Sequence, residues 1–268
     1  MKLATFNING IKARLPRLKE WLAETRPAAA CLQEIKSQDE GFPAGEIEAL
    51  GYSVIWHGQK AFNGVAICAD REAGYALEEV QRGLGIDGPN EGEGEQARYL
   101  EADLLREGER ALRLVNIYLP NGNPQPGPKF DYKLAWMERL RARMKAIWAE
   151  EAPAAVLGDY NVIPHDDDTY SVRAMAKDAL IQPESRAAYA RLLADGWCDA
   201  VRTLNPRGGV WTYWDYQAGA WQRDHGFRID HLLLSPELAD RLRAVGVDRE
   251  HRGREKASDH APVWASFA

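Results

Sequence analysis

The sequence predicts an α/β fold, in which strands and helices alternate along the chain. Short runs rich in β-branched and aromatic residues alternate with segments whose apolar residues recur at helical spacing. Apolar residues make up 45% of the 268 residues, which is enough for a large buried core. Strand patterns continue on both sides of each Gly- and Pro-rich segment, so no linker is indicated. We therefore expect a single domain spanning residues 1–268.

The first half of the chain contains six expected strands and one helix. The strands are Leu3–Ile8, Ala28–Gln33, Tyr52–Trp56, Val65–Ala69, Arg98–Leu104 and Leu112–Leu119. A helix is expected after the first strand, because Leu15, Leu18 and Leu22 lie on one face at a 3.6-residue period. The last two strands are expected to pair across the charged turn EGER.

The second half begins with the clearest helix of the sequence. This helix, Phe130–Ala149, has its apolar residues on one side and its basic residues largely elsewhere. The apolar set is Phe130, Leu134, Met137, Met144, Ile147 and Trp148, and the basic set is Lys133, Arg139, Arg143 and Lys145. The elements expected after it are a strand at Ala154–Leu157, a capped helix at Ser185–Asp195, and strands at Phe227–Leu234 and Pro262–Phe267. Segments Arg82–Gln96 and Pro120–Lys129 are rich in Gly, Pro and Asn and are expected to be loops.

Composition and charge exclude several classes of protein. No apolar run approaches the roughly 18 residues of a membrane span, and the start, MKLATFNING, lacks the apolar region of a secretory signal. Three scattered cysteines indicate neither a disulfide framework nor a zinc site, which favours a reducing, cytoplasmic location. The net charge of −6 disfavours a protein that coats nucleic acid, but it is compatible with a catalytic pocket rich in carboxylates.

Several expected strands end in a carboxylate, an amide or another polar side chain. These residues are Asn7, Asn9, Glu34, Tyr118, Asn121, Asp159 and Asn161, and Asp259 and His260 stand just before the last strand. A single Asp or Asn after a strand is usually turn chemistry, but five or six such strand ends in one fold are harder to explain in that way. If they gather at one edge, they form a cluster of oxygen ligands suited to a hard cation such as Mg²⁺. A single candidate histidine and the absence of clustered cysteines disfavour zinc.

The adjacent residues Asp259 and His260 are expected to have separate partners. Neighbouring side chains in an extended segment point to opposite faces. Asp230 lies inside the apolar run RIDHLLLS, where a buried carboxylate needs a partner. We therefore expect Asp230 to pair with His260 and fix its tautomer, which leaves Asp259 free to face a metal or the floor of the site.

Three other segments have a simpler interpretation. HDDDTY (165–170) and REHRGREK (249–256) are runs of adjacent charges, and such runs are expected to be solvated. The glycine-rich segment around Gly92 lacks the GKS/T of a Walker motif, so nothing suggests nucleotide binding.

Six motifs, in order, resemble the exonuclease III family of abasic-site (AP) endonucleases: TFNINGIKAR, CLQEIK, YLPNG, GDYN, RIDHLLLS and SDHAPV. The resemblance extends from Lys2 to Phe267. GDxN and SDHxP indicate only the larger endonuclease/exonuclease/phosphatase superfamily, whereas NING, LQE and the aromatic segment WTYWDY…GFRID indicate the exonuclease III branch. The resemblance implies a four-layer α/β sandwich of the deoxyribonuclease I type, in which two packed mixed β-sheets are flanked by helices and the site lies at one edge.

The resemblance also implies roles in catalysis and metal binding. Glu34 resembles the principal Mg²⁺ ligand, with Asn7 and Asp259 nearby, and Mn²⁺ can substitute for Mg²⁺. Asp159 resembles the residue that activates the attacking water, and Asn161 the residue that helps to hold the water and the phosphate. With one or two metal ions described for the family, Asp159 and Asn161 are also candidate ligands. His260, supported by Asp230, and Tyr118 resemble residues that face the phosphate.

Further positions resemble residues that contact DNA. Tyr213, Phe227 and Ile229, with Trp214 beside them, match the walls of a pocket for an abasic sugar. Plain core packing is the alternative for Tyr213 and Trp214. Arg14, Lys36 and Asn121 match positions that touch DNA or support the metal site. The segments that follow Asn121 and Asp159 depart from the family pattern, which bears on exonuclease processivity and strand preference.

The function implied by the resemblance is that of a monomeric, Mg²⁺-dependent DNA repair nuclease. Its expected substrate is double-stranded DNA with abasic sites or 3′ ends, which it would cleave 5′ to the abasic site and trim in the 3′→5′ direction. One alternative is a phosphodiesterase or phosphatase of lipid or inositol phosphates, which the aromatic pocket segment disfavours. Another is a non-catalytic nucleic-acid-binding regulator, which need not keep every catalytic residue, as this sequence does.

Overall fold

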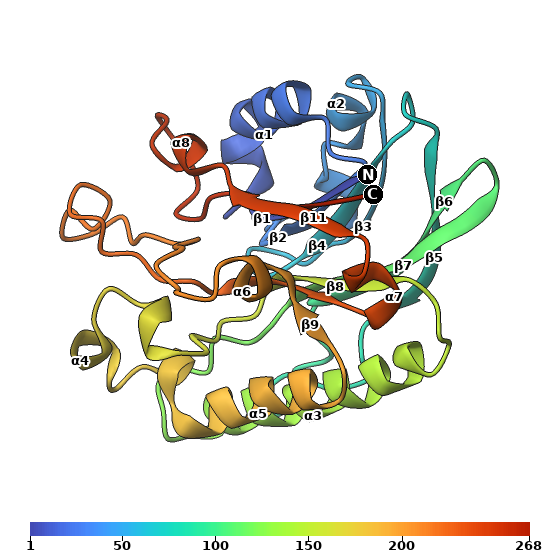
Figure 1. The fold of residues 1–268 in the computed structure, drawn as a ribbon. Helices are drawn as coiled ribbons and strands as arrows, with labels where there is room; N and C mark the ends of the chain where they lie inside the picture. The colour runs from blue at the N-terminus through green and yellow to red at the C-terminus, as the bar shows by residue number, and fades with distance from the viewer.

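The computed structural model describes residues 1–268 and contains two six-stranded mixed sheets packed face to face (Figure 1). The first sheet has the order β11 (Leu242–Val247), β12 (Val263–Phe267), β1 (Lys2–Asn7), β2 (Ala29–Gln33), β4 (Val65–Asp70), β3 (Tyr52–His57). The second has the order β5 (Tyr75–Arg82), β6 (Tyr99–Arg106), β7 (Glu109–Tyr118), β8 (Ala154–Asp159), β10 (Asp230–Leu234), β9 (Cys198–Asp199). Helices α1 (Ile11–Thr25) and α2 (Ala44–Glu48) lie outside the first sheet, and α3 (Pro128–Trp148) and α5 (Pro183–Ala194) outside the second (Figure 1). The four-layer sandwich is thus confirmed.

The central strands β1, β2 and β8 are predominantly apolar because both of their faces are buried. In β2, Ala29 and Cys31 face the opposite sheet, whereas Ala30 and Leu32 join the cluster beneath α1. Alternation of side chains across the strand produces this division, and it fills two layers of core from one segment. None of the helices combines the length and the apolar character needed to cross a membrane.

The strands expected from the sequence are all present, and their boundaries differ from the expected ones by at most three residues. The strand expected from Phe227 begins instead at Asp230, because residues 227–229 leave the ladder and Phe227 forms isolated bridges with Thr169 and Tyr213. β5, β9 and β11 were not expected. In β5 most side chains are exposed or half-buried, so the strand lacks the apolar alternation that would reveal it. The short helices α2, α4 (Val172–Met175), α6 (Ala200–Leu204), α7 (Pro236–Ala239) and α8 (Arg249–Arg252) were also not expected.

The expected division of α3 into an apolar and a basic side is wrong at two residues. Trp148, at the end of the helix, is 42% exposed, whereas Lys133 is completely buried. The Lys133 amino group donates hydrogen bonds to the backbone carbonyls of Asn121 and Asn161, and these interior acceptors are what a pattern of residue types does not reveal. Burial lowers the pKa of Lys133 to about 7.

The two charge runs expected to be solvated are partly buried. In the first, Asp166 and Asp167 are exposed as expected, but Asp168 is fully buried against the Arg228 guanidinium. In the second, the Arg252 guanidinium is buried and donates to the carbonyl of Trp214. In each case a partner that is distant in sequence compensates the buried charge, so the local run of charges was misleading.

Strand direction brings the polar strand ends to one edge of the sandwich. β1 runs parallel to β2, and β7 runs parallel to β8, so the carboxyl ends of each pair lie together. β12 runs antiparallel to β1, and β10 antiparallel to β8, so these strands begin at the same edge. In register, Asp159 stands opposite Asp230 on one side and Tyr118 on the other.

Candidate active site

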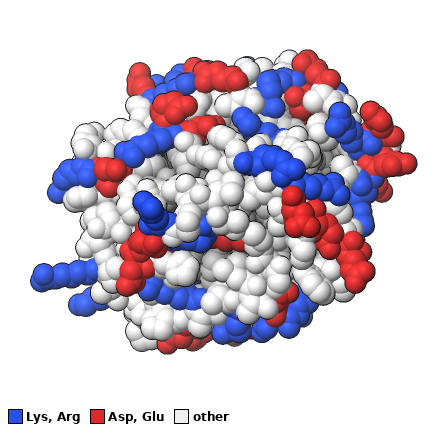
Figure 2. Space-filling model, viewed as in Figure 1, with Lys and Arg blue, Asp and Glu red and all other residues white.

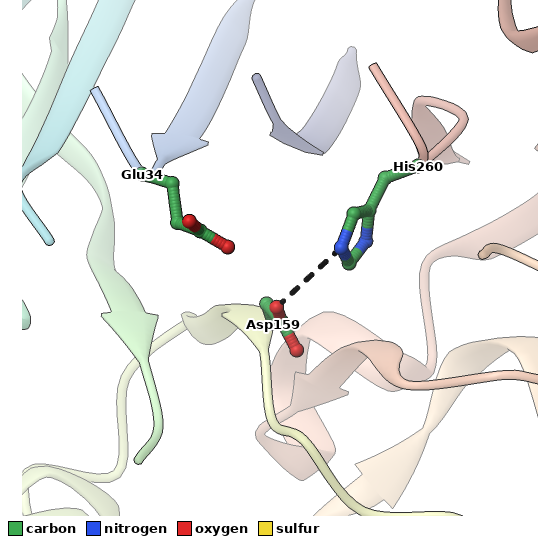
Figure 3. A group of neighbouring side chains, drawn as sticks. All are labelled: Glu34, Asp159 and His260. Carbon is green, nitrogen blue, oxygen red and sulfur yellow. Dashed lines mark ion pairs between the residues drawn. The ribbon is translucent and has the colours of Figure 1, made fainter. Parts of the chain in front are cut away.

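Two carboxylates and a histidine from both sheets converge at this edge. Glu34 follows β2, Asp159 ends β8 and His260 precedes β12, and one ligand atom of each lies within 4.8 Å of the others. Figure 3 shows the three side chains pointing toward a common space between the sheets. The group therefore exists only because the two sheets are packed with these ends together.

His260 is held between two aspartates. Its Nδ1 lies 2.8 Å from Asp230 Oδ2, which is the pairing expected from strand alternation. Its Nε2 lies 3.7 Å from Asp159 Oδ2 (Figure 3). Burial lowers the pKa of His260, but the charges of Asp230, Asp159 and Asp259 outweigh it and raise the pKa to about 10. At neutral pH the ring is therefore an imidazolium, with Nδ1–H directed to Asp230 and Nε2–H to the cavity side.

Asp159 is the most crowded carboxylate of the site. Burial raises its pKa, and the charges of Asp230 and Glu34 raise it further, against the opposing effect of His260. The Asn7 amide nitrogen donates to both carboxylates, at 2.9 Å from Asp159 Oδ2 and 2.8 Å from Glu34 Oε1. The Asn7 side-chain oxygen accepts from the backbone N–H of Asn9 at 3.0 Å. Asn7 thus acts here as a bridging donor, and its oxygen would bind a cation only after the amide rotates.

Glu34 is balanced by a lysine. Burial alone would raise the pKa of Glu34, but the Lys36 ammonium, 2.9 Å from Oε2, and the Asn7 amide together lower it. Lys36 also donates to Asn9 Oδ1 at 2.6 Å, and Asn9 Nδ2 donates to Asp259 Oδ1 at 3.0 Å. Backbone strain gathers here, since Asn9, Glu34 and Lys36 all have φ between 47° and 50°.

Asn161 is fixed at every polar group. Its backbone N–H donates to Asp159 Oδ1 at 2.9 Å, and its side-chain nitrogen donates to the carbonyl of Leu119 at 2.9 Å. Its side-chain oxygen accepts from Asn121 Nδ2 at 3.2 Å, and its backbone carbonyl accepts from Lys133. Asn161 also has a positive φ of 48°, which costs about 1 kcal/mol for a residue with a Cβ.

A cavity of about 480 Å³ opens above these residues. Its polar lining includes Glu34, Tyr118, Asn121, Asp159, Asn161, Asp259 and His260, and its apolar lining includes Tyr213, Phe227 and Ile229. Five of the expected site residues do not line it, namely Asn7, Arg14, Lys36 and Asp230, and also Trp214. Asn7 lies beneath the carboxylates, whereas Lys36 and Arg14 stand beside the site, with Arg14 Nη2 3.2 Å from the hydroxyl oxygen of Tyr216.

Trp214 is also absent from the cavity wall. It is fully buried, and its ring packs edge-on against Trp221 at 5.0 Å between centroids. The guanidinium of Arg249 stands 5.1 Å from each of these two rings, and that of Arg252 is 5.0 Å from the ring of Tyr216. These arginine–aromatic contacts of helix α8 hold the loop that follows Tyr213 in place. The core-packing alternative is correct for Trp214 but not for Tyr213.

Ten of the residues that line the cavity were not identified from the sequence, among them Tyr170 and His225. Tyr170 and His225 stack with 4.3 Å between centroids and 5° between planes, and both line the cavity. They belong to segments 55 positions apart in the sequence, so only their contact in space reveals the pair.

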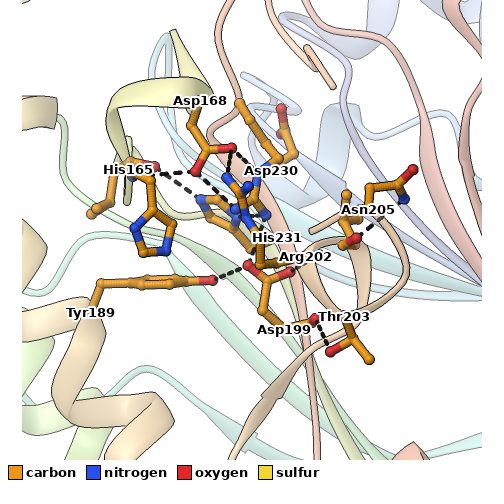
Figure 4. A network of polar contacts seen from close by, with 12 residues as sticks. His165, Asp168, Tyr189, Asp199, Arg202, Thr203, Asn205, Asp230 and His231 are labelled. Carbon is orange, nitrogen blue, oxygen red and sulfur yellow. Dashed lines mark hydrogen bonds and ion pairs between the residues drawn. The ribbon is translucent and has the colours of Figure 1, made fainter. Parts of the chain in front are cut away.

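A buried charge network stands behind the cavity wall (Figure 4). Arg228 donates to Asp168 at 2.7 Å, to Asp199 Oδ2 at 2.8 Å and to His231 Nδ1 at 3.0 Å. His231 Nε2 lies 2.9 Å from the carbonyl oxygen of Val162. The network fixes the segment that carries Ile229 and Asp230. Arg228, two residues before Asp230 in an otherwise apolar run, is the sequence signal that could have revealed this network.

The chain belongs to the endonuclease/exonuclease/phosphatase family, which it matches over residues 4–260. Within the family it is 35% identical to exodeoxyribonuclease III of Haemophilus influenzae over 100% of both chains. Its fold is similar to an AP endonuclease from Archaeoglobus fulgidus, with 33% identity and a TM-score of 0.88 over 100% of this chain and 99% of that one. A 3′-5′ exonuclease, NExo, from Neisseria meningitidis has 34% identity and a TM-score of 0.90 over the same shares. The chain is therefore a phosphodiesterase of the exodeoxyribonuclease III and AP endonuclease type.

Proposed function

We propose that this protein is a Mg²⁺-dependent DNA repair nuclease that cleaves 5′ to abasic sites and removes nucleotides from the 3′ ends of duplex DNA. The observation that carries the proposal is the position of Asp159 and the His260–Asp230 pair at the floor of a cavity walled by Tyr213, Phe227 and Ile229. The similar proteins point the same way. They include an AP endonuclease and NExo, which is both a 3′-5′ exonuclease and a 3′ phosphatase and has been solved with a product DNA hairpin.

The donor set fits a hard divalent cation. Glu34 and Asp159 offer carboxylate oxygens, and Asp259 and Asn161 face the same cavity. His260 is a poor ligand, because Asp230 engages Nδ1 and the raised pKa keeps a proton on Nε2. A Mg²⁺ ion held by Glu34 and Asp159, or Mn²⁺ in its place, would supply positive charge for the phosphate oxygens. Such an ion would also relieve the repulsion between buried carboxylates that raises the pKa of Asp159.

The side chains divide the work of hydrolysis. Asp159, once deprotonated, accepts a proton from the attacking water, and Asn161 orients the water and the phosphate. The His260 imidazolium donates from Nε2 to a non-bridging phosphate oxygen. Burial and the Glu34 charge raise the pKa of Tyr118 well above its usual value, so its hydroxyl stays protonated and serves as a second donor. Fixed donors aimed at developing charge are the main source of stabilisation in such sites.

The cavity walls favour a sugar without a base. Tyr213 and Phe227 lie 4.6 Å apart between ring centroids, and with Ile229 they present an apolar surface. Extruding an abasic nucleotide sacrifices no base pair, so it is the least costly nucleotide to place there. Trp214 lies behind this wall, where its ring packs against Trp221. Arg249 of α8 covers the ring of Trp221 in turn.

We expect DNA to be contacted by a few polar and basic side chains near the cavity rather than by an extended positively charged surface. Figure 2 shows Lys and Arg interspersed with Asp and Glu over the face viewed there, in keeping with the net charge of −6. Arg14, Lys36 and Asn121 stand beside or in the cavity, where a phosphate backbone would pass.

An end-labelled duplex with a single abasic analogue tests the proposal. We expect incision directly 5′ to the analogue and a ladder of products from the 3′ end in Mg²⁺ or Mn²⁺, with neither in EDTA. The matched duplex without the analogue should show only the ladder. A ladder without incision would reduce the function to that of an exonuclease, and faster hydrolysis of inositol phosphates would contradict a DNA substrate. Absence of all cleavage would favour a non-catalytic regulator.

A further inference from the structure

The buried lysine of α3 has no part in the chemistry described above. Lys133 is completely buried, although its amino group is costly to remove from water. Both of its hydrogen-bond acceptors are backbone carbonyls, those of Asn121 and Asn161. These are the two amide residues at the floor and rim of the cavity. The hydrogen bonds to these two carbonyls compensate the burial of the amino group.

The two carbonyls belong to neighbouring turns. Asn121 follows β7 and Asn161 follows β8, and these strands are parallel, so their carboxyl ends emerge side by side. The side chains of the two residues are already joined, with Asn121 Nδ2 3.2 Å from Asn161 Oδ1. Lys133 joins the same two residues a second time, from below and through their backbones. The turns are thus tied together at two levels.

The lysine stem is enclosed as closely as its amino group. A Cβ at Gly122 would stand 2.7 Å from Lys133 Cδ, and the φ of Gly122 is +91°. The chain therefore passes directly over the lysine stem at the residue after Asn121. This packing confines the stem, whose amino group donates to the two carbonyls.

Lys133 also completes the fixation of Asn161. Asp159, Leu119 and Asn121 engage the other polar groups of that residue. Only its carbonyl depends on Lys133. Since Asn161 has an unfavourable positive φ, its backbone stays in place only while these contacts hold it. A rotation of this turn would move the amide that orients the phosphate.

We propose that Lys133 is a positioning residue for phosphodiester hydrolysis, which holds the Asn161 amide in its working orientation by binding the Asn121 and Asn161 carbonyls from beneath the site. The inference rests on the proposed role of Asn161. It does not depend on whether the diester belongs to an abasic site or to another DNA end. Misplacement of a positioned group by about 1 Å can reduce turnover on the order of 100-fold.

The first test replaces Lys133 by Met, which keeps the volume of the stem and removes the donor. We expect kcat to fall at least about tenfold while KM changes by less than about threefold, because the lost effect concerns orientation in the transition state. Lys145→Met is the matched control, since Lys145 is an exposed lysine of the same helix, and it should leave both constants unchanged. A folded Lys133→Met protein with wild-type kcat would overturn the proposal.

A double-mutant cycle separates positioning from a general structural defect. Lys133→Met is measured alone and combined with Asn161→Ala, on the abasic duplex and on bis(p-nitrophenyl) phosphate with Mg²⁺. If Lys133 acts through Asn161, the double variant should lie within about threefold of Asn161→Ala. Fully multiplicative losses would refute this. If the Met variant does not fold, Lys133→Gln replaces it and the same two outcomes decide. If the wild-type protein hydrolyses bis(p-nitrophenyl) phosphate but not the abasic duplex, the proposed DNA substrate is wrong. The cycle measured on the simple diester would still test the role of Lys133.

Discussion

Acidification should weaken the fold through His231, the histidine of the buried network behind the cavity wall. Burial, and next the charge of Arg228, lower the pKa of His231 from 6.5 to about 4. Above pH 6.5 the ring is neutral in both the folded and the unfolded chain, so its contribution to stability is complete. Between pH 6.5 and 4, His231 is protonated in the unfolded chain but remains neutral in the folded chain. The free energy of unfolding therefore decreases as the pH falls.

The size of the effect follows from the two pKa values. At about 1.4 kcal/mol per pH unit, the interval from 6.5 to about 4 corresponds to about 3 kcal/mol of unfolding free energy. The lowered pKa of His231 has a direct structural cause. Its Nδ1 accepts a hydrogen bond from the Arg228 guanidinium, so a proton on Nδ1 would break that bond. The loss would loosen the segment that carries Ile229 and Asp230, so we expect the cavity wall to be among the acid-sensitive parts of the molecule.

Urea unfolding followed by tryptophan fluorescence, at several pH values from 7 to 4.5, measures this loss. His231→Gln, which keeps a donor and an acceptor but cannot be protonated, should be less stable at pH 7 and lose less stability on acidification. His251, whose pKa burial also lowers, contributes equally to both proteins and cancels. His165→Gln, at an exposed position, is the control and should follow the wild type. An identical pH dependence in His231→Gln and wild type would refute the reasoning.

Three further predictions concern the site. Asp159→Asn should lower kcat for abasic-duplex cleavage by about 10²–10⁴-fold with an unchanged circular dichroism spectrum, and near-normal turnover would exclude Asp159 as the base. Asp230→Asn removes the charge that most raises the pKa of His260, so the ring should lose its proton at a lower pH. Because the His260 ring then donates as a neutral imidazole, the cleavage rate at pH 8 should fall about tenfold, and it should fall further as the pH rises. A pH–rate profile parallel to that of the wild type would contradict this prediction. Mg²⁺ should raise the melting temperature of the wild type, since a ligand that binds only the folded state stabilises it. Glu34→Gln should abolish most of that rise, and an equal rise in both proteins would place the ion elsewhere.

The sequence by itself determined the longer helices, nine of the twelve strands and the chemistry of the strand ends. Short apolar runs, such as AACL of β2 and AAVL of β8, are typical of a strand with two buried faces. Alternation along an extended segment also separated Asp259 from His260 and assigned Asp230 to the histidine. That contact is present at 2.8 Å, because the argument used only local geometry and the need of a buried carboxylate for a partner.

Only the tertiary structure decided which distant groups compensate one another. Lys133, Asp168 and Arg252 stand in patterns that predict solvent exposure, yet each is buried against a partner at least 12 positions away. Trp214 is an aromatic residue of the kind that lines pockets, but it lies buried behind the cavity wall. The free energy of a buried charge or ring depends on what surrounds it in space, and a local pattern carries no information about that. The packing of the two sheets supplied it, and the same packing brings Glu34, Asp159 and His260 into one site.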